Sequence, residues 1–153
     1  MNKKIIFKKN QASKFAYFSL MFVAGTSIEQ VNELGFSHLI EHLLIRAGNE
    51  QSLNELFDMN GAAIKGETSR DYINLSGYCL AEDFNKIFKI LISRIFNLSI
   101  TEDELLREKK IVLIELNQYE NSKKSINDNR VIFKNSSWSI DIIGTRGNIE
   151  YVS

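Results

Sequence analysis

Two histidines and one glutamate stand within five residues, in the order His38-Leu-Ile-Glu-His42, and the chain has no other histidine. Residues four positions apart lie on one face of a helix, so both imidazoles can point at the same place if this segment is helical. Two such imidazoles supply half of a tetrahedral zinc site, and Glu41 is close enough to reach a water molecule held there. The pentapeptide therefore predicts a metal site rather than two unrelated surface histidines.

A third protein ligand must come from elsewhere, and the residues alone leave two sources open. Cys79, the only cysteine, falls on the same side of an alternating stretch as Ile73 and Leu75, so we expect it to be a buried core thiol. Glu108 and Glu115 are two helical turns apart and would share a face. A carboxylate that faces a core needs a partner, and a cation is one. We therefore favour the glutamates over Cys79 as the source.

Five segments match, in order and in approximate spacing, the motifs of one peptidase family. They are Phe22–Glu29 (the pattern aGs..E), Gly35–Leu44 (G.aHflEHml), Gly61–Tyr72 (GG..NA.Ts.d.t.y), Glu104–Glu115 (le.Er.vvl.E) and Asp141–Thr145 (p.lGt). By these motifs the chain, from about Phe15 to its end, resembles the insulinase-type metallopeptidases, which include pitrilysin and the mitochondrial processing peptidase.

The resemblance implies a role for each candidate site residue. His38 and His42 would bind zinc, Glu115 would take the third ligand position, and Glu108 would be the acid that orients a ligating imidazole from behind. Zinc would activate a water molecule, and Glu41 would act as the general base. The implied reaction is hydrolysis of peptide bonds in peptides or unfolded polypeptides. The gap of 72 residues between His42 and Glu115 is a few short of the family's usual spacing.

The resemblance also implies where a substrate binds. In the family a substrate adds as an extra strand at a sheet edge, which here corresponds to about Lys65–Ser69. We therefore expect Lys65, Gly66, Thr68 and Ser69 to bind substrate. The sequence departs from the family here, because the family's asparagine is replaced by Lys65, which Gly66 follows.

Two alternatives to an active peptidase remain open. One is a non-catalytic or partner-dependent insulinase-type subunit, although such subunits typically lose the metal motif. The other is an S-ribosylhomocysteine lyase-like enzyme, which would use a cysteine as third ligand and would leave both Glu108 and Glu115 unexplained. The family's domain continues past Ser153, so we expect residues 1–153 to form a single, incomplete domain. It would require a second insulinase-like domain or subunit, or would self-associate.

Composition narrows the remaining classes. The chain has 153 residues, 44% hydrophobic and 25% charged, and a formal net charge of +0, values typical of one globular domain without a nucleic-acid or membrane partner. A single cysteine suits a reducing compartment. Met1–Lys4 followed by the apolar run Phe15–Ala24 imitates a secretory signal, but lysines continue to Lys14, so we expect a cytoplasmic protein.

The family resemblance implies an α+β fold, a two-layer sandwich whose mostly antiparallel sheet has helices on one face. Periodicity predicts strands over 15–23, which we expect to be central, and over 72–80. It predicts helices from Asn32 or Glu33 to about Arg46, and over 84–96. Capping boxes predict two more helices, one from 52–55 to the Asn60-Gly61 pair and one from 101–104 through Glu115. We expect residues 121–129 to form a loop.

Overall fold

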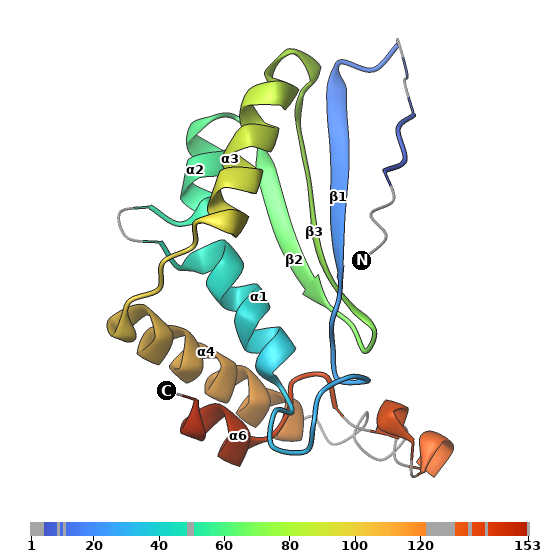
Figure 1. Ribbon diagram of the computed structural model, residues 1–153, viewed down its shortest axis with the longest axis vertical. Helices are drawn as coiled ribbons and strands as arrows, with labels where there is room; N and C mark the ends of the chain where they lie inside the picture. Colours follow the sequence, from blue (N-terminus) through green and yellow to red (C-terminus); the bar gives the residue numbers. More distant parts are fainter. Residues whose placement is uncertain are drawn as a thin grey trace.

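The sheet is built from two strands that each pair with a third. In the computed structural model, which describes residues 5–8, 10, 12–48, 51–121, 131–134, 136–139 and 141–152, strands β1 (Phe15–Val23) and β2 (Ala63–Thr68) pair antiparallel with β3 (Tyr72–Leu80). The order is β1-β3-β2, and the helices pack on one side of this sheet (Figure 1). The predicted α+β architecture and both predicted strand ranges are confirmed.

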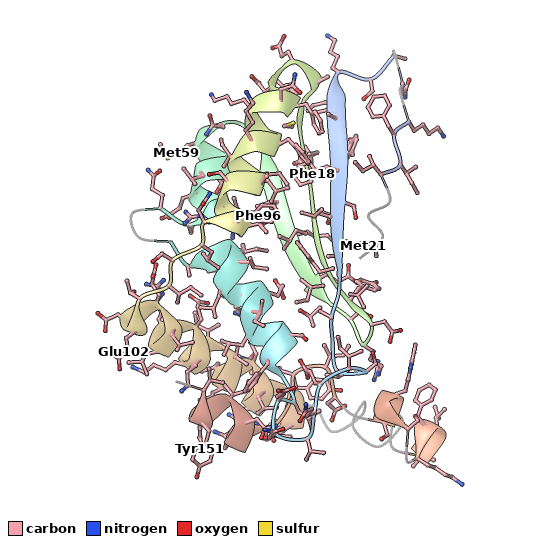
Figure 2. All side chains as sticks on the ribbon, viewed as in Figure 1. Phe18, Met21, Met59, Phe96, Glu102 and Tyr151 are labelled. Carbon is pink, nitrogen blue, oxygen red and sulfur yellow. The ribbon has the colours of Figure 1, made fainter. Side chains whose placement is uncertain are left out.

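The predicted central position of residues 15–23 is wrong, because β3 is central and β1 lies at an edge. Side chains of β1 alternate between half-buried and exposed, and Tyr17 and Val23 are 74% and 80% exposed. The continuous apolar run suggested a central strand because side chains on both faces of β1 are apolar. The helices, however, cover only one face of the sheet. Figure 2 shows Phe18 on the covered side, where its ring lies 5.9 Å from that of Phe57.

Strand β2 is absent from the predicted element list, although a substrate-binding edge was expected at about Lys65–Ser69. Its sequence, Ala-Ile-Lys-Gly-Glu-Thr, contains a glycine and two charged residues and gives little strand signal. Pairing with β3 fixes it, with Ala63 opposite Tyr78 and Thr68 opposite Ile73. Because β2 pairs only with β3 among the described strands, the expected position at an edge is confirmed.

Three helices cover the sheet. They are α1 (Phe36–Arg46), α2 (Leu53–Met59) and α3 (Phe84–Phe96), the last entered through a short 3₁₀ turn, Ala81–Asp83. Between them and the sheet lies a core of fully buried side chains that includes Leu53, Phe57, Leu75, Ile87 and Leu91. The ranges predicted for α3 and for the end of α1 are confirmed, and the capping box of Ser52 and Glu55 is present.

Helices α4 (Glu102–Asn121) and α6 (Arg146–Tyr151) form a second layer against α1 (Figure 1). A second apolar cluster joins them through Leu39, Leu43, Ala47, Val112 and Ile149. A further short 3₁₀ helix spans Ser137–Ser139. No helix of the described residues is long and apolar enough to cross a membrane. Asn121 ends α4, and the loop expected over 121–129 otherwise lies outside the described residues.

One buried carboxylate ties the start of α4 to the end of α1. Glu104 accepts hydrogen bonds from the Thr101 backbone N–H (2.8 Å), the Thr101 hydroxyl (2.8 Å) and the Gly48 backbone N–H (2.6 Å). The sequence predicted the two contacts to Thr101 as a capping box, whereas the contact to Gly48 comes from tertiary packing. Glu104 therefore fixes where the chain leaves α1.

We expect Glu104→Ala to lower the free energy of unfolding by about 2 kcal/mol, because two backbone N–H groups lose their acceptor. Urea unfolding followed by circular dichroism measures this loss. Glu102→Ala is the matched control, since Glu102 is exposed in the same helical turn, and it should cost about 0.5 kcal/mol at most. Equal losses in the two variants would contradict a tertiary role for Glu104.

Candidate metal centre

Helix α1 carries the histidine pair, and its start is set by residues outside the helix. Gly35 precedes the helix with φ 98°, a conformation that favours glycine. Because glycine has no side chain, it cannot cap the helix itself. Glu29 does so instead, because its carboxylate accepts from the backbone N–H of Gly35 (2.8 Å) and of Ser37 (2.6 Å). For this reason α1 begins at Phe36 and not at Asn32 or Glu33 as predicted.

The helical spacing brings His38 and His42 together as predicted. Their ring centroids lie 4.7 Å apart with an interplanar angle of 82°. Among the described residues, donor atoms of His38, Glu41 and His42 form a set in which every pair is within 4.8 Å. His42 is 4% exposed, so the imidazole pair lies at the inner end of a recess rather than on an open surface.

Helix α4 places both predicted glutamates at the histidine pair. Glu115 Oε2 lies 3.6 Å from His38 Nε2 and 3.5 Å from His42 Nε2. Glu108 approaches from the other side, with Oε2 at 3.4 Å from His42 Nδ1, and it is 1% exposed. His42 thus has one carboxylate at each ring nitrogen. Both glutamates lie on the face of α4 that meets the histidines, so the prediction that they share a helix face is confirmed.

Glu115 Oε2 lies at about the separation of zinc ligands from the Nε2 atom of each histidine. Ligand atoms at about 2.0–2.1 Å from a tetrahedral zinc ion are about 3.3 Å from one another. The two distances from Glu115 Oε2 to the Nε2 atoms, 3.6 and 3.5 Å, are close to this value and too long for hydrogen bonds. Among the described residues, His42 Nδ1 and Glu108 Oε2 lie 3.4 Å apart without forming a hydrogen bond, and His38 Nδ1 has no hydrogen-bond partner either. Two imidazoles and a carboxylate are donors that zinc binds.

Electrostatics favours the protonation states that a metal site needs. Burial, together with the neighbouring His42 and Arg46, lowers the pKa of His38 from 6.5 to about 4, so the ring is neutral at pH 7. Burial raises the pKa of Glu41 above its usual value, while the nearby His42 opposes this shift. A neutral imidazole can bind a metal, and a carboxylate with a raised pKa is a better proton acceptor.

The four residues expected to bind substrate fall into two groups. Thr68 lines the pocket and donates a hydrogen bond from Oγ1 to Glu41 Oε2 (3.3 Å). Gly66 faces Glu41, because a Cβ atom there would lie 1.9 Å from Glu41 Oε1. Lys65 is exposed and alternates to the opposite face of the sheet, and Ser69 bonds to Tyr72 in the turn. The structure therefore brings Gly66 and Thr68 to the site, but not the side chain of Lys65.

The alternative third ligand, Cys79, does not reach the site. It is fully buried in the core between the sheet and the helices, as its alternation with Ile73 and Leu75 indicated. An S-ribosylhomocysteine lyase-like arrangement would need a cysteine at the histidines. The structure gives this alternative no support.

Several residues at the site were missed as site residues by sequence reasoning. A pocket of about 270 Å³ opens beside His38 and is lined by His38, Glu41, Thr68, Arg70, Glu115, Tyr119, Ile142 and Ile143. Tyr119 continues the Glu108–Glu115 face by one more helical turn, which was a usable signal. It donates a hydrogen bond to Asp141 (3.1 Å) and so joins α4 to the turn that carries the two isoleucines. Arg70 and the isoleucines gave no chemical signal of their own.

The pKa of His38 predicts a pH-dependent stability of the metal-free protein. Between pH 6.5 and about 4 the unfolded chain binds a proton at His38 and the folded chain does not. The free energy of unfolding should therefore fall as the pH drops through this window, by about 3 kcal/mol at most.

Urea unfolding with a chelator at pH 7 and pH 4.5 tests this, with His38→Gln as the comparison. The raised pKa of Glu41 acts in the opposite sense in both proteins. The wild type should thus lose more stability on acidification than His38→Gln. The same loss in both would show that His38 titrates normally.

Comparisons with known proteins agree with this geometry. The family model described as Insulinase (Peptidase family M16) matches residues 4–139. The uncharacterized zinc protease YmxG of Bacillus subtilis (strain 168) is 25% identical over 148 residues, which cover 93% of this chain and 36% of the relative. Subunit beta of the human (Homo sapiens) mitochondrial-processing peptidase is 25% identical over 136 residues, covering 85% of this chain and 28% of the relative.

A solved structure has the same fold. The peptidase M16 inactive domain from Pseudomonas fluorescens superimposes with a TM-score of 0.81 at 16% identity, covering 94% of this chain and 37% of that one. The chain spans about a third of the length of the curated relatives it matches. Because the family model covers most of the sequence, the chain belongs to the insulinase family of peptidases, peptidase family M16.

Proposed function

We propose that this chain is the metal-binding part of a zinc metallopeptidase that hydrolyses peptide bonds in peptides or unfolded polypeptides. The observation that carries the proposal is the convergence of His38 Nε2, His42 Nε2 and Glu115 Oε2, at 3.5–3.6 Å for both nitrogen–oxygen pairs. Glu41 lies beside this set within the same pocket. A site of two imidazoles and one carboxylate leaves a fourth position open, as catalytic zinc sites do.

Two carboxylates compete for the role of third ligand, and we assign it to Glu115. Glu41 lies within 4.8 Å of both histidines, but its Oε2 accepts a hydrogen bond from Thr68. A single oxygen of Glu115 faces the Nε2 atoms of both histidines, while Glu108 lies at the other ring nitrogen of His42. Glu108 would hold the orientation of that ring, as carboxylates behind metal-bound histidines do.

When bound, zinc lowers the pKa of a water molecule and polarises a carbonyl group. The other parts of the reaction belong to the chain. Glu41 would accept a proton from the attacking water and give it to the leaving amine, a role that its raised pKa supports. Thr68 would hold the Glu41 carboxylate at the end of β2. The free edge of β2 would bind the substrate backbone as an added strand.

A non-catalytic or partner-dependent subunit is the second candidate. The structure from Pseudomonas fluorescens is described as an inactive domain and shares this fold, and the human relative is a subunit of an enzyme. The retained His38, Glu41, His42 and Glu115 favour catalysis here. A second insulinase-like domain or subunit, or another copy of this chain, would complete the substrate-binding chamber in either case.

One prediction of the proposed function concerns the metal itself. The wild-type protein should retain one zinc ion per chain after dialysis against metal-free buffer, whereas His42→Ala should not, because one of three protein ligands is lost. Elemental analysis of both proteins measures the ratio. Full zinc retention by His42→Ala would remove this residue from the site.

Another prediction of the proposed function separates metal binding from proton transfer. Glu41→Gln should keep its zinc and lose peptidase activity by about a hundredfold or more, because the amide cannot accept a proton. Glu115→Gln should lose zinc. Glu102 is exposed at the first position of α4, far from the histidines, so Glu102→Gln should change neither zinc content nor peptidase activity. Zinc content and peptide cleavage, measured together with the partner domain where one is needed, give both readouts. Loss of zinc in Glu41→Gln but not in Glu115→Gln would reverse the two roles.

A further inference from the structure

Arg70 is a positively charged residue in the wall of the pocket, and the proposed reaction gives it no role. It lies in the turn between β2 and β3, directly after the edge strand, and is half-buried. It lines the same pocket as His38, Glu41 and Glu115. A substrate bound at the histidines would therefore meet its guanidinium group.

The guanidinium group of Arg70 is held in place by Trp138. Its Nε donates a hydrogen bond to the Trp138 carbonyl oxygen (3.1 Å), and its Cζ lies 5.6 Å from the centre of the Trp138 ring. Stacking and one hydrogen bond fix the plane of the group. Within the described part of the chain, neither terminal nitrogen of Arg70 donates a hydrogen bond, so both can bind a ligand.

No acidic side chain of the described residues neutralises Arg70. The ion pairs of this part of the chain do not include it, although Glu41 and Glu115 line the same pocket. A half-buried charge without an opposite charge nearby is unfavourable, and a planar guanidinium group can bind a carboxylate through two parallel hydrogen bonds. The pocket thus presents an oriented group that a carboxylate of a bound ligand would satisfy.

We propose that Arg70 binds a carboxylate of the substrate, so that the pocket selects acidic peptides. The inference rests on the proposed peptidase function and names the substrate class of the same site. The carboxylate has two possible sources, an Asp or Glu side chain or the free C-terminus of a peptide. Arg70 would determine specificity, while the residues on α1 and α4 carry out the reaction.

Binding to the zinc-loaded Glu41→Gln protein tests the proposal without consuming the peptide. The probes are blocked penta-alanine peptides with one Glu at each position in turn, their Gln counterparts, and the unsubstituted peptide with a free or amidated C-terminus. Isothermal titration calorimetry gives affinities. Emission of Trp138, the only tryptophan, reports whether the ligand reaches Arg70.

One carboxylate peptide should bind about tenfold or more tightly than its neutral counterpart and change Trp138 emission, as expected for a charged hydrogen bond. In Arg70→Met the affinities for the carboxylate peptide and for its neutral counterpart should agree within about twofold. If Arg70→Met folds poorly, Arg70→Gln, which keeps a polar group at this position, should show the same loss of preference. Lys89→Met, on the exposed side of α3, should keep the preference. The position of the preferred carboxylate distinguishes a side chain from a C-terminus.

Each other outcome overturns the proposal in a recognisable way. Peptide binding without a preference for carboxylates, or a preference that survives in Arg70→Met and Arg70→Gln, would exclude Arg70 as the selecting residue and leave the peptidase function intact. Failure of every peptide to bind the zinc-loaded protein would instead contradict substrate capture by this chain, and the role of Arg70 with it.

Discussion

The carboxylate of Glu108 is the group on which the arrangement of the helices depends. It is 1% exposed, and a buried charge without a partner costs several kcal/mol. Its Oε2 lies 3.4 Å from His42 Nδ1 on α1, and its Oε1 accepts a hydrogen bond (3.3 Å) from Arg107 Nε on α4. The next residue, Lys109, is also buried and donates to the carbonyl oxygens of Glu150 (2.8 Å) and Val152 (2.5 Å) at the end of α6. Neighbouring opposite charges on α4 therefore fix α1 on one side and α6 on the other.

Helix α1 packs against two apolar cores at once, and this packing fixes the direction in which its polar side chains point. Ile45 belongs to the core under the sheet, whereas Leu39 and Leu43 belong to the core shared with α4 and α6. A helix packed on two sides cannot rotate without losing one of its cores. The histidines and Glu41 are thereby aimed between the edge strand and α4. Gly66 completes the fit, because any side chain at this position of β2 would collide with Glu41.

Local signals in the sequence predicted much of the fold and half of the site. The strands over 15–23 and 72–80, the helix over 84–96 and both capping boxes follow from periodicity and from short-range hydrogen bonding. The histidine pair and the spacing of Glu108 and Glu115 are also local, since each is a property of one helix. The start of α1 was misjudged because it depends on Glu29, which caps the helix from outside its sequence range. The edge position of β1 and the existence of β2 depend on pairing with β3 and have no local cause. The orientation of Arg70 at the pocket depends on Trp138, 68 positions away in the sequence.

The assignment of the three zinc ligands is the central claim, and anomalous diffraction at the zinc edge from crystals grown with zinc tests it most directly. We expect one peak per chain, about 2.0–2.2 Å from His38 Nε2, His42 Nε2 and a carboxylate oxygen of Glu115. Glu41 should remain outside bonding distance and within reach of the fourth ligand position. A peak bonded to Glu41 in place of Glu115, or the absence of any peak at the histidine pair, would contradict the account.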